Sequence, residues 1–325
     1  MAEEPKKKSP INFGRILIAL FLFFVVYAIY AVSSKQLKSS LALFDGTAFV
    51  MACGLAFGNY VVRFLKWEYY LAQLGIRGVK KVDSFLTFLS GFILTVSPGK
   101  VGEVFKSLVL EETYGVPIPK TAPIVVAERI TDLIGIITLI ILGSLGFHGG
   151  LAIAGLGACL VAALLVVISS RPLSMRIIGL IARLPGPFRK IGPKLELAYE
   201  SLTILVAPKN LLLPTLLSIG AWSLECLALW VILRGFGEHL SVPLCFFFYA
   251  TSTLAGALVA IVPGGLGITE EGLREQLIDI GKVSSGVAVG AMMLVRIATL
   301  WFAVAVGFVA LGLLKLRYPN LLKAR

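Results

Sequence analysis

Two short stretches of this sequence decide the fold, because each interrupts a long apolar region with helix-breaking residues and charge. They are Pro98-Gly99-Lys100-Val101-Gly102-Glu103 and Pro263-Gly264-Gly265-Leu266-Gly267, the second reaching its acid at Glu270. Each glutamate is followed 26 residues later by an arginine, Arg129 or Arg296, that opens the pattern Arg-Ile-x-x-Leu. Ionisable residues in hydrocarbon are costly and indicate function. Their repetition at equal spacing makes chance a poor explanation.

The composition is that of an integral membrane protein. Hydrophobic residues make up 58% of the 325 positions and charged residues 15%, against about 25% charged in a soluble domain. Spans and short connections account for nearly the whole length, so we expect one membrane domain without a soluble catalytic domain. The four cysteines lie singly in apolar stretches, so we expect no disulfide framework, no metal and no cofactor. The net charge of +12 comes from basic residues at the ends of spans, which argues against a nucleic acid partner.

Apolar length predicts an all-α polytopic fold, since about 20 residues cross a bilayer. Six stretches qualify as full spans: 13–33, 45–66, 121–146, 150–170, 208–234 and 285–314. Two more, 83–112 and 243–280, are broken by Pro-Gly and are predicted to be broken helices or re-entrant hairpins. We therefore expect a tail at 1–12, a membrane domain at 13–316 and a second tail at 317–325. Within the domain we place repeat one at 45–146, a basic amphipathic linker at 171–207 and repeat two at 208–314.

The distribution of basic residues predicts the orientation, because Lys and Arg of short loops collect on the cytoplasmic side. With both termini cytoplasmic, 21 of the 30 basic residues fall in cytoplasmic segments, among them all those from Arg63 to Lys81. This holds only if both broken stretches return to the side they entered from. The two repeats then have inverted topology, the architecture of many secondary transporters with a substrate site at the repeat interface. We expect a multi-pass protein of the cell (inner) membrane.

The broken stretches carry the residues expected at two hairpin tips. Proline ends a half-helix and glycine permits a tight turn close to a ligand. The next half-helix then presents free N–H groups and a positive dipole end that favour an anion. The tip residues are Pro98, Gly99 and Gly102 in the first hairpin and Pro263, Gly264, Gly265 and Gly267 in the second. The alternative is that Pro-Gly simply caps each turn against neighbouring helices.

The charged residues form the candidate substrate site. We expect Lys100, Arg129 and Arg296 to present positive charge to a phosphate headgroup, since arginine suits bidentate phosphate contacts. Glu103, Glu270 and Asp132 would hold those side chains and exchange protons; Glu128, four residues before Asp132 on one helix face, and Glu271 are supporting residues. Arg296 has no acid within four residues, so Glu270 or Glu103 is its expected partner. The alternative is a purely structural salt-bridge network between the repeats.

These motifs resemble a known family. Ser97 to Glu103, Glu128-Arg129-x-x-Asp132 and the second Pro-Gly motif with Glu270-Glu271 are similar to the flippase-like family named after the transmembrane region of lysylphosphatidylglycerol synthase. The resemblance covers roughly residues 12–316. It implies a polytopic domain that moves aminoacylated or other polar lipids between leaflets. The soluble aminoacyl-transfer domain of fused members has no counterpart in these residues, so we expect no synthase activity.

Three functions remain open from the sequence. The preferred one is a flippase for a polar lipid, whose partner is an anionic or aminoacylated phospholipid, with a homo-oligomer left open. The second is a small-solute or ion carrier that uses the same charges. The third is an intramembrane enzyme, for which Glu270-Glu271-x-x-Arg274 is one residue short of the membrane-protease spacing and lacks an embedded histidine. We therefore expect no catalytic residue, and we expect the two Glu–Arg pairs to be equally sensitive to mutation.

Overall fold

The computed structural model describes residues 40–96, 103–144, 192–259 and 263–322, with single positions between 155 and 170. All regular elements in these residues are helices. Three helices are long and apolar enough to cross a membrane, at Gly46–Gln73, Pro208–Gly235 and Ser285–Arg317. This agrees with the predicted all-α membrane class. The predicted spans 13–33 and 150–170 and most of the linker 171–207 lie outside the described residues, as do the tip residues Pro98, Gly99, Lys100 and Gly102.

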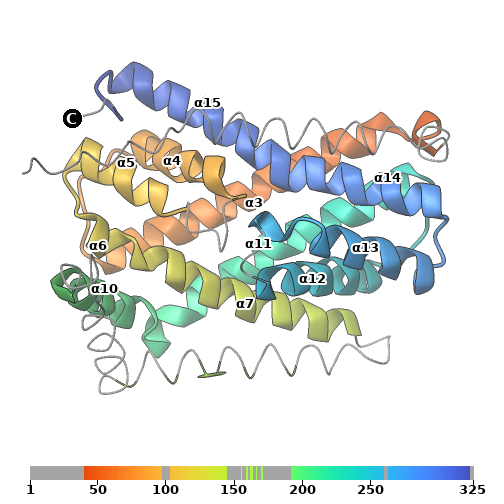
Figure 1. Ribbon diagram of the computed structural model, residues 1–325, viewed down its shortest axis with the longest axis horizontal. Coiled ribbons are helices and arrows are strands. Elements are labelled where there is room, and N and C mark those ends of the chain that lie inside the picture. The colour runs from red at the N-terminus through yellow and green to blue at the C-terminus, as the bar shows by residue number, and fades with distance from the viewer. Residues whose placement is uncertain are drawn as a thin grey trace, which may run out of the picture.

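Two long helices form the centre of the molecule (Figure 1). They are α3 (Gly46–Gln73) and α11 (Pro208–Gly235), which run antiparallel. Asp45 caps α3 by accepting from the Thr47 amide at 2.9 Å, and its own amide donates to the Gly235 carbonyl at 2.9 Å. Near the middle, the Asn59 side-chain amide donates to the Ala221 carbonyl at 2.7 Å. The start of α3 is therefore fixed to the end of α11.

The helix α3 corrects one prediction. The span 45–66 was expected to end where the basic residues begin, with Arg63 and Lys66 in a cytoplasmic segment. Instead α3 continues to Gln73, and both side chains are buried. The positive-inside rule counts basic residues by their place in the sequence, so it does not reveal that a buried acid of another helix neutralises two of them.

The chain between α3 and α11 begins with a helical hairpin that packs beside α15 (Figure 1). Its arms are α4 (Lys81–Ser90), extended by the 3₁₀ turn η1 (Gly91–Leu94), and α5 (Phe105–Tyr114). Next come the short α6 (Ile118–Thr121), α7 (Pro123–Ser144) and, further along, α10 (Gly192–Leu205). The first arm and α5 agree with the predicted break in the apolar stretch 83–112.

The chain after α11 has the same order of elements. Its hairpin consists of α12 (Val242–Leu258), the 3₁₀ turn η4 (Pro263–Gly265) and α13 (Ile268–Asp279). Then α14 (Ser285–Arg296), a π-helical turn η5 (Ile297–Trp301) and α15 (Phe302–Arg317) form one continuous helix. In Figure 1 the α4–α5 hairpin lies at the end of the molecule where α3 finishes, and the α12–α13 hairpin lies toward the opposite end.

The two halves interlock where a helix of one half meets the hairpin of the other. A Cβ added at Gly143 of α7 would lie 2.7 Å from the Phe247 nitrogen of α12, and one added at Gly307 of α15 would lie 2.8 Å from the Ile93 nitrogen of η1. Glycine is required at both positions because only its absent side chain permits such close backbone contact. Each hairpin is thus held against the long helix of the other half.

The buried apolar residues form two main clusters that lie on either side of the charged residues. One cluster takes in α4, α5 and the first part of α7 up to Ile130. The other takes in α11 to α14 and the later part of α7 from Ile136. Asp132 lies between these two parts of α7. The charged groups described below therefore occupy the junction between the two apolar cores.

Candidate functional site

A cavity of about 270 Å³ lies where the two halves meet. Its wall combines residues from α3, η1, α7, α11, α12, the α12–α13 tip and the continuous helix α14–η5–α15. The wall is amphiphilic, because both charged and apolar side chains line it. Charged lining residues are Arg63, Arg129, Asp132, Glu225 and Arg296, and apolar ones include Phe92, Leu133, Ile136, Leu258 and Leu300.

The first Glu–Arg pair is formed at this cavity. The Arg129 Nη2 donates to Glu103 Oε2 at 2.9 Å, and the same nitrogen lies 3.5 Å from Asp132 Oδ2. Glu103 is buried, whereas the Arg129 side chain is 26% exposed. Glu103 and Asp132 therefore both hold Arg129, and the 26-residue spacing corresponds to a real contact.

The second pair has the same spacing and a different setting. Arg296 Nε donates to Glu270 Oε1 at 2.5 Å, which identifies Glu270 as the partner that the sequence left open between two acids. Arg296 Nη2 also donates to the Gly264 carbonyl at 3.2 Å, and the Gly267 amide donates to Glu270 Oε2 at 2.6 Å. The pair is thus bonded to the tip of the α12–α13 hairpin.

The tip itself has the backbone geometry expected of its glycines. Gly264, Gly265 and Gly267 have φ of 62°, 68° and 85°, a region that L side chains rarely adopt. Gly264 and Gly265 also line the cavity. Pro263 begins the 3₁₀ turn η4, just before them. The second predicted tip therefore lies against the site.

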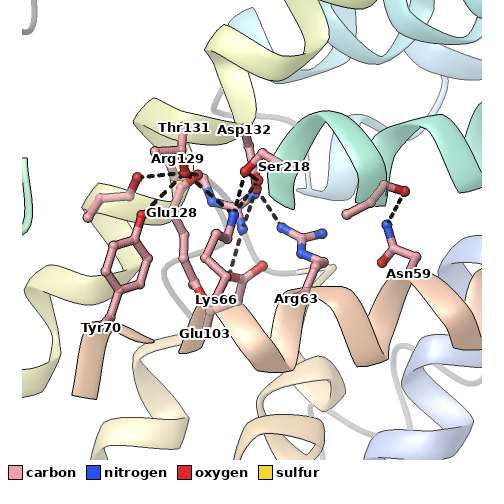
Figure 2. Close-up of polar contacts among 12 residues, drawn as sticks. Asn59, Arg63, Lys66, Tyr70, Glu103, Glu128, Arg129, Thr131, Asp132 and Ser218 are labelled. Carbon is pink, nitrogen blue, oxygen red and sulfur yellow. Dashed lines mark hydrogen bonds and ion pairs between the residues drawn. The ribbon is translucent and has the colours of Figure 1, made fainter. Parts of the chain in front are cut away.

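The centre of the charged cluster is Asp132, and two of its partners were missed at the level of sequence (Figure 2). Arg63 Nη2 donates to Asp132 Oδ2 at 2.5 Å, and Lys66 Nζ donates to Asp132 Oδ1 at 2.6 Å. Ser218 of α11 accepts from Lys66 at 2.8 Å and donates to Asp132 Oδ1 at 3.0 Å. One carboxylate on α7 therefore binds two cations of α3 and a hydroxyl of α11.

A signal for these two residues exists in the sequence. The polar side chains Asn59, Arg63, Lys66 and Tyr70 are spaced by four, three and four residues, so a helix that continues past residue 66 presents all of them on one face. Tyr70 lies 3.4 Å, oxygen to oxygen, from Thr131, one residue before Asp132 (Figure 2). The stripe therefore faces α11 at Asn59 and α7 from Arg63 to Tyr70.

A separate buried ion pair lies behind this cluster. Lys106 Nζ donates to Glu128 Oε2 at 2.6 Å, and both residues are buried. The ammonium group also lies 4.8 Å from the ring centroid of Trp67 and 5.5 Å from that of Phe88, within cation–π range. Glu128 and Asp132, although four residues apart on α7, thus bind different cations.

The remaining acidic residues differ in their relation to the cavity. Glu225 of α11 lines it and accepts from the Tyr249 hydroxyl at 2.8 Å. Glu271 pairs with Arg274 one turn along α13, and its side chain is 55% exposed. The cavity wall includes Glu225, which the sequence analysis left out of the site, and does not include Glu271, which it took as supporting.

Comparison with known proteins places the chain in a family. The family model described as the lysylphosphatidylglycerol synthase TM region matches residues 12–307. A UPF0104 membrane protein of Methanothermobacter thermautotrophicus is 23% identical, with 92% of this chain and 94% of that protein covered. A UPF0104 membrane protein of Pyrococcus horikoshii is also 23% identical, with 79% and 83% covered. Since the matching model spans most of the chain, this multi-pass membrane protein belongs to the family of the lysylphosphatidylglycerol synthase transmembrane region.

Proposed function

We propose that this protein moves a polar, phosphate-bearing lipid across the bilayer. The headgroup enters the charged cavity while the acyl chains stay in the hydrocarbon. The observation that carries the proposal is that two Glu–Arg pairs of equal spacing, from distant parts of the chain, meet at one cavity in an otherwise apolar protein. Buried charges of this kind mark the substrate and ion paths of membrane transporters.

The arrangement of the helices supports an alternating-access mechanism. We propose six full spans and two re-entrant hairpins, related as an inverted repeat, with both termini cytoplasmic and the protein in the cell membrane. The α4–α5 and α12–α13 hairpins lie toward opposite ends of the molecule (Figure 1). A movement of the α12–α13 tip away from the cavity would then open the site toward one side of the membrane.

Two features of the cavity favour a lipid over a free solute. Its wall is amphiphilic, so it suits a ligand with both a charged and an apolar part. Leu258 lines the cavity at the end of α12 and is 54% exposed. We propose that the cavity opens to the bilayer at this apolar end, which would give the lipid tails a lateral path.

The residues present suggest transport without a chemical step. Each strongly basic group at the cavity is bound to a carboxylate, and such pairs neutralise an empty carrier. An arginine of the cavity wall could exchange part of its contacts for phosphate oxygens, because a guanidinium group can bind several acceptors. That the protein is a carrier and not an enzyme stays a prediction.

Reconstitution tests the function directly. The full chain is inserted into liposomes of phosphatidylcholine with a fluorescent phosphatidylglycerol, phosphatidylethanolamine or aminoacylated phosphatidylglycerol, and the fraction of label accessible from outside is followed over time. We expect faster exchange than in empty liposomes for at least one lipid, and a loss of this exchange in Arg129→Gln. Uptake of soluble phosphate esters without any lipid movement would favour the small-solute carrier and would contradict the flippase.

A further inference from the structure

The two Glu–Arg pairs have equal spacing but differ in how many of their atoms are already bound. Arg296 uses Nε for Glu270 and Nη2 for the Gly264 carbonyl, and its side chain is 8% exposed. Glu270 uses its second oxygen for the Gly267 amide. Any ligand that took Arg296 would break bonds that hold the turn between α12 and α13. This pair is thus part of the structure of the tip.

Arg129 is bound differently. Its contacts with Glu103 and Asp132 both come from Nη2, and its side chain is three times as exposed as that of Arg296. Its Nε is buried and donates to no acceptor in the part of the chain that the structure describes. A buried donor without an acceptor is costly, and a ligand oxygen would relieve that cost. Arg129 therefore has binding capacity that Arg296 has already used.

Arg129 also shares a carboxylate with other cations. Arg63, Lys66 and Arg129 are bound by Asp132, and Arg129 is also bound by Glu103. Behind them, Lys106 and Glu128 compensate each other. The other acid on this cavity wall, Glu225, comes from α11 and accepts a hydrogen bond from Tyr249. Asp132 is thus divided among three cations, so a phosphate oxygen can take over part of its contacts with Arg63 and Arg129.

A further polar group lines the same cavity. The Thr253 hydroxyl on α12 is buried and makes no hydrogen bond with any described residue. The guanidinium carbon of Arg63 lies 5.6 Å from the centroid of the Trp222 ring, within cation–π range. Two guanidinium groups and a free hydroxyl on one cavity match the donors that phosphate oxygens require.

We propose that Arg63 and Arg129 form the anion seat of the cavity, where they bind phosphate oxygens, and that Arg296 with Glu270 is the latch that holds the α12–α13 tip. That the phosphate belongs to a lipid headgroup rests on the proposed function. From the equal spacing alone, mutations in the two Glu–Arg pairs are expected to be equally damaging. The proposal instead gives the two arginines different roles. Arg63 becomes a ligand-binding residue, and Arg296 becomes a positioning residue that acts through the tip.

Binding of two phosphate sources to the purified full chain in dodecyl maltoside tests the seat. One arm titrates inorganic phosphate and the other titrates phosphatidylglycerol in mixed micelles. In each arm that shows binding, we expect Arg63→Gln and Arg129→Gln to weaken it about tenfold or more, as for the loss of a charge-assisted contact. Arg296→Gln should change it less than about threefold and should increase hydrogen exchange of residues 263–279, which a role in ligand contact alone would not do.

The controls separate the seat from folding and from the proposed function. Arg234→Gln, at the end of α11 beside Trp230, removes a cation outside the cavity wall and should leave binding unchanged. Arg63→Lys and Arg129→Lys keep the charge, so an intermediate loss is expected even if a glutamine variant does not fold. Binding of inorganic phosphate alone, with the same arginine dependence, would support the seat and contradict the lipid function. Equal losses in Arg129→Gln and Arg296→Gln, losses in neither, or no binding in either arm would overturn the seat.

Discussion

The two halves of the molecule can be aligned by their Glu–Arg pairs, so that Glu103 corresponds to Glu270 and Arg129 to Arg296. In this register the halves differ at specific positions. In the first half, Asp132 follows Arg129 by three residues; in the second half, Thr299 follows Arg296 by three. Asp132 binds three cations, whereas Thr299 bonds the Tyr249 hydroxyl at 3.2 Å and the Val295 carbonyl at 2.8 Å. The same position of the register therefore holds a charged carboxylate in one half and a neutral hydroxyl in the other.

The contrast extends to the residues behind the site. Lys106 and Glu128 are 22 residues apart and form a buried ion pair. The positions in the same register of the second half are Leu273 and Val295, both fully buried in the apolar cluster of that half. What the two halves share is the Glu–Arg pair and the hairpin. The second half thus forms the same elements without these extra charges.

Loss of Asp132 should have the largest effect and would break the comparison most directly. Asp132→Asn keeps the shape and removes the carboxylate that Arg63, Lys66 and Arg129 share. Removing one partner of a buried ionic network costs about 3–5 kcal/mol. The free energy of unfolding, measured by titration with a denaturing detergent, should fall by this amount, and Lys66→Met in the same chain should restore part of it.

The matched control is Thr299→Val in the second half. It removes a neutral hydroxyl at the equivalent position, so a loss of about 1 kcal/mol is expected. If Asp132→Asn and Thr299→Val lowered the free energy of unfolding equally, the ionic network of the first half would not stabilise the protein more than the hydroxyl of the second half does. The comparison between the halves would then fail.

The sequence predicted the parts of this site that repeat. The spacing of 26 residues paired Glu103 with Arg129, and the absence of a nearby acid directed Arg296 to Glu270 or Glu103. Both broken apolar stretches contain separate helices where Pro-Gly interrupts them. These features are visible because each depends on short sequence separations or on a repeat.

The parts that were missed depend on packing between distant helices. Arg63 and Lys66 were counted among the basic residues of a cytoplasmic segment, and only Asp132 on α7 and Ser218 on α11 show why they are buried. Lys106 meets Glu128 because α5 packs near the start of α7. The sequence gives a helix face for each residue and leaves open which residue of another helix lies opposite.

Replacing the ion pair of the first half by the residues of the second half should have a smaller effect. Lys106→Leu alone leaves Glu128 as an unpaired buried charge and should cost about 3 kcal/mol or more. The double variant Lys106→Leu with Glu128→Val reproduces the apolar pair, and such replacements are often neutral or stabilising. The double-mutant cycle in the free energy of unfolding measures the difference.

The behaviour of the double variant shows whether Lys106 and Glu128 serve transport or only packing. A stable double variant that no longer moves lipid would assign Lys106 and Glu128 to transport, for example as groups that exchange a proton. A stable double variant with normal transport would leave the pair as a tolerated substitute for apolar packing. An unstable double variant would contradict the equivalence of the two halves at this position.

The smallest effect is expected at Glu271, where the comparison is between neighbours on α13. Glu270 is buried and holds both Arg296 and the Gly267 amide, whereas Glu271 is mostly exposed and pairs with Arg274 on its own helix. Exposed pairs of this kind contribute about 0.5 kcal/mol or less. Glu271→Gln should therefore leave both unfolding and lipid exchange unchanged, while Glu270→Gln should loosen the tip and raise hydrogen exchange at residues 263–279. If Glu271→Gln slowed transport as much as Glu270→Gln, the acid outside the cavity would have to reach the substrate during the cycle, and the site would be larger than the cavity of the resting state.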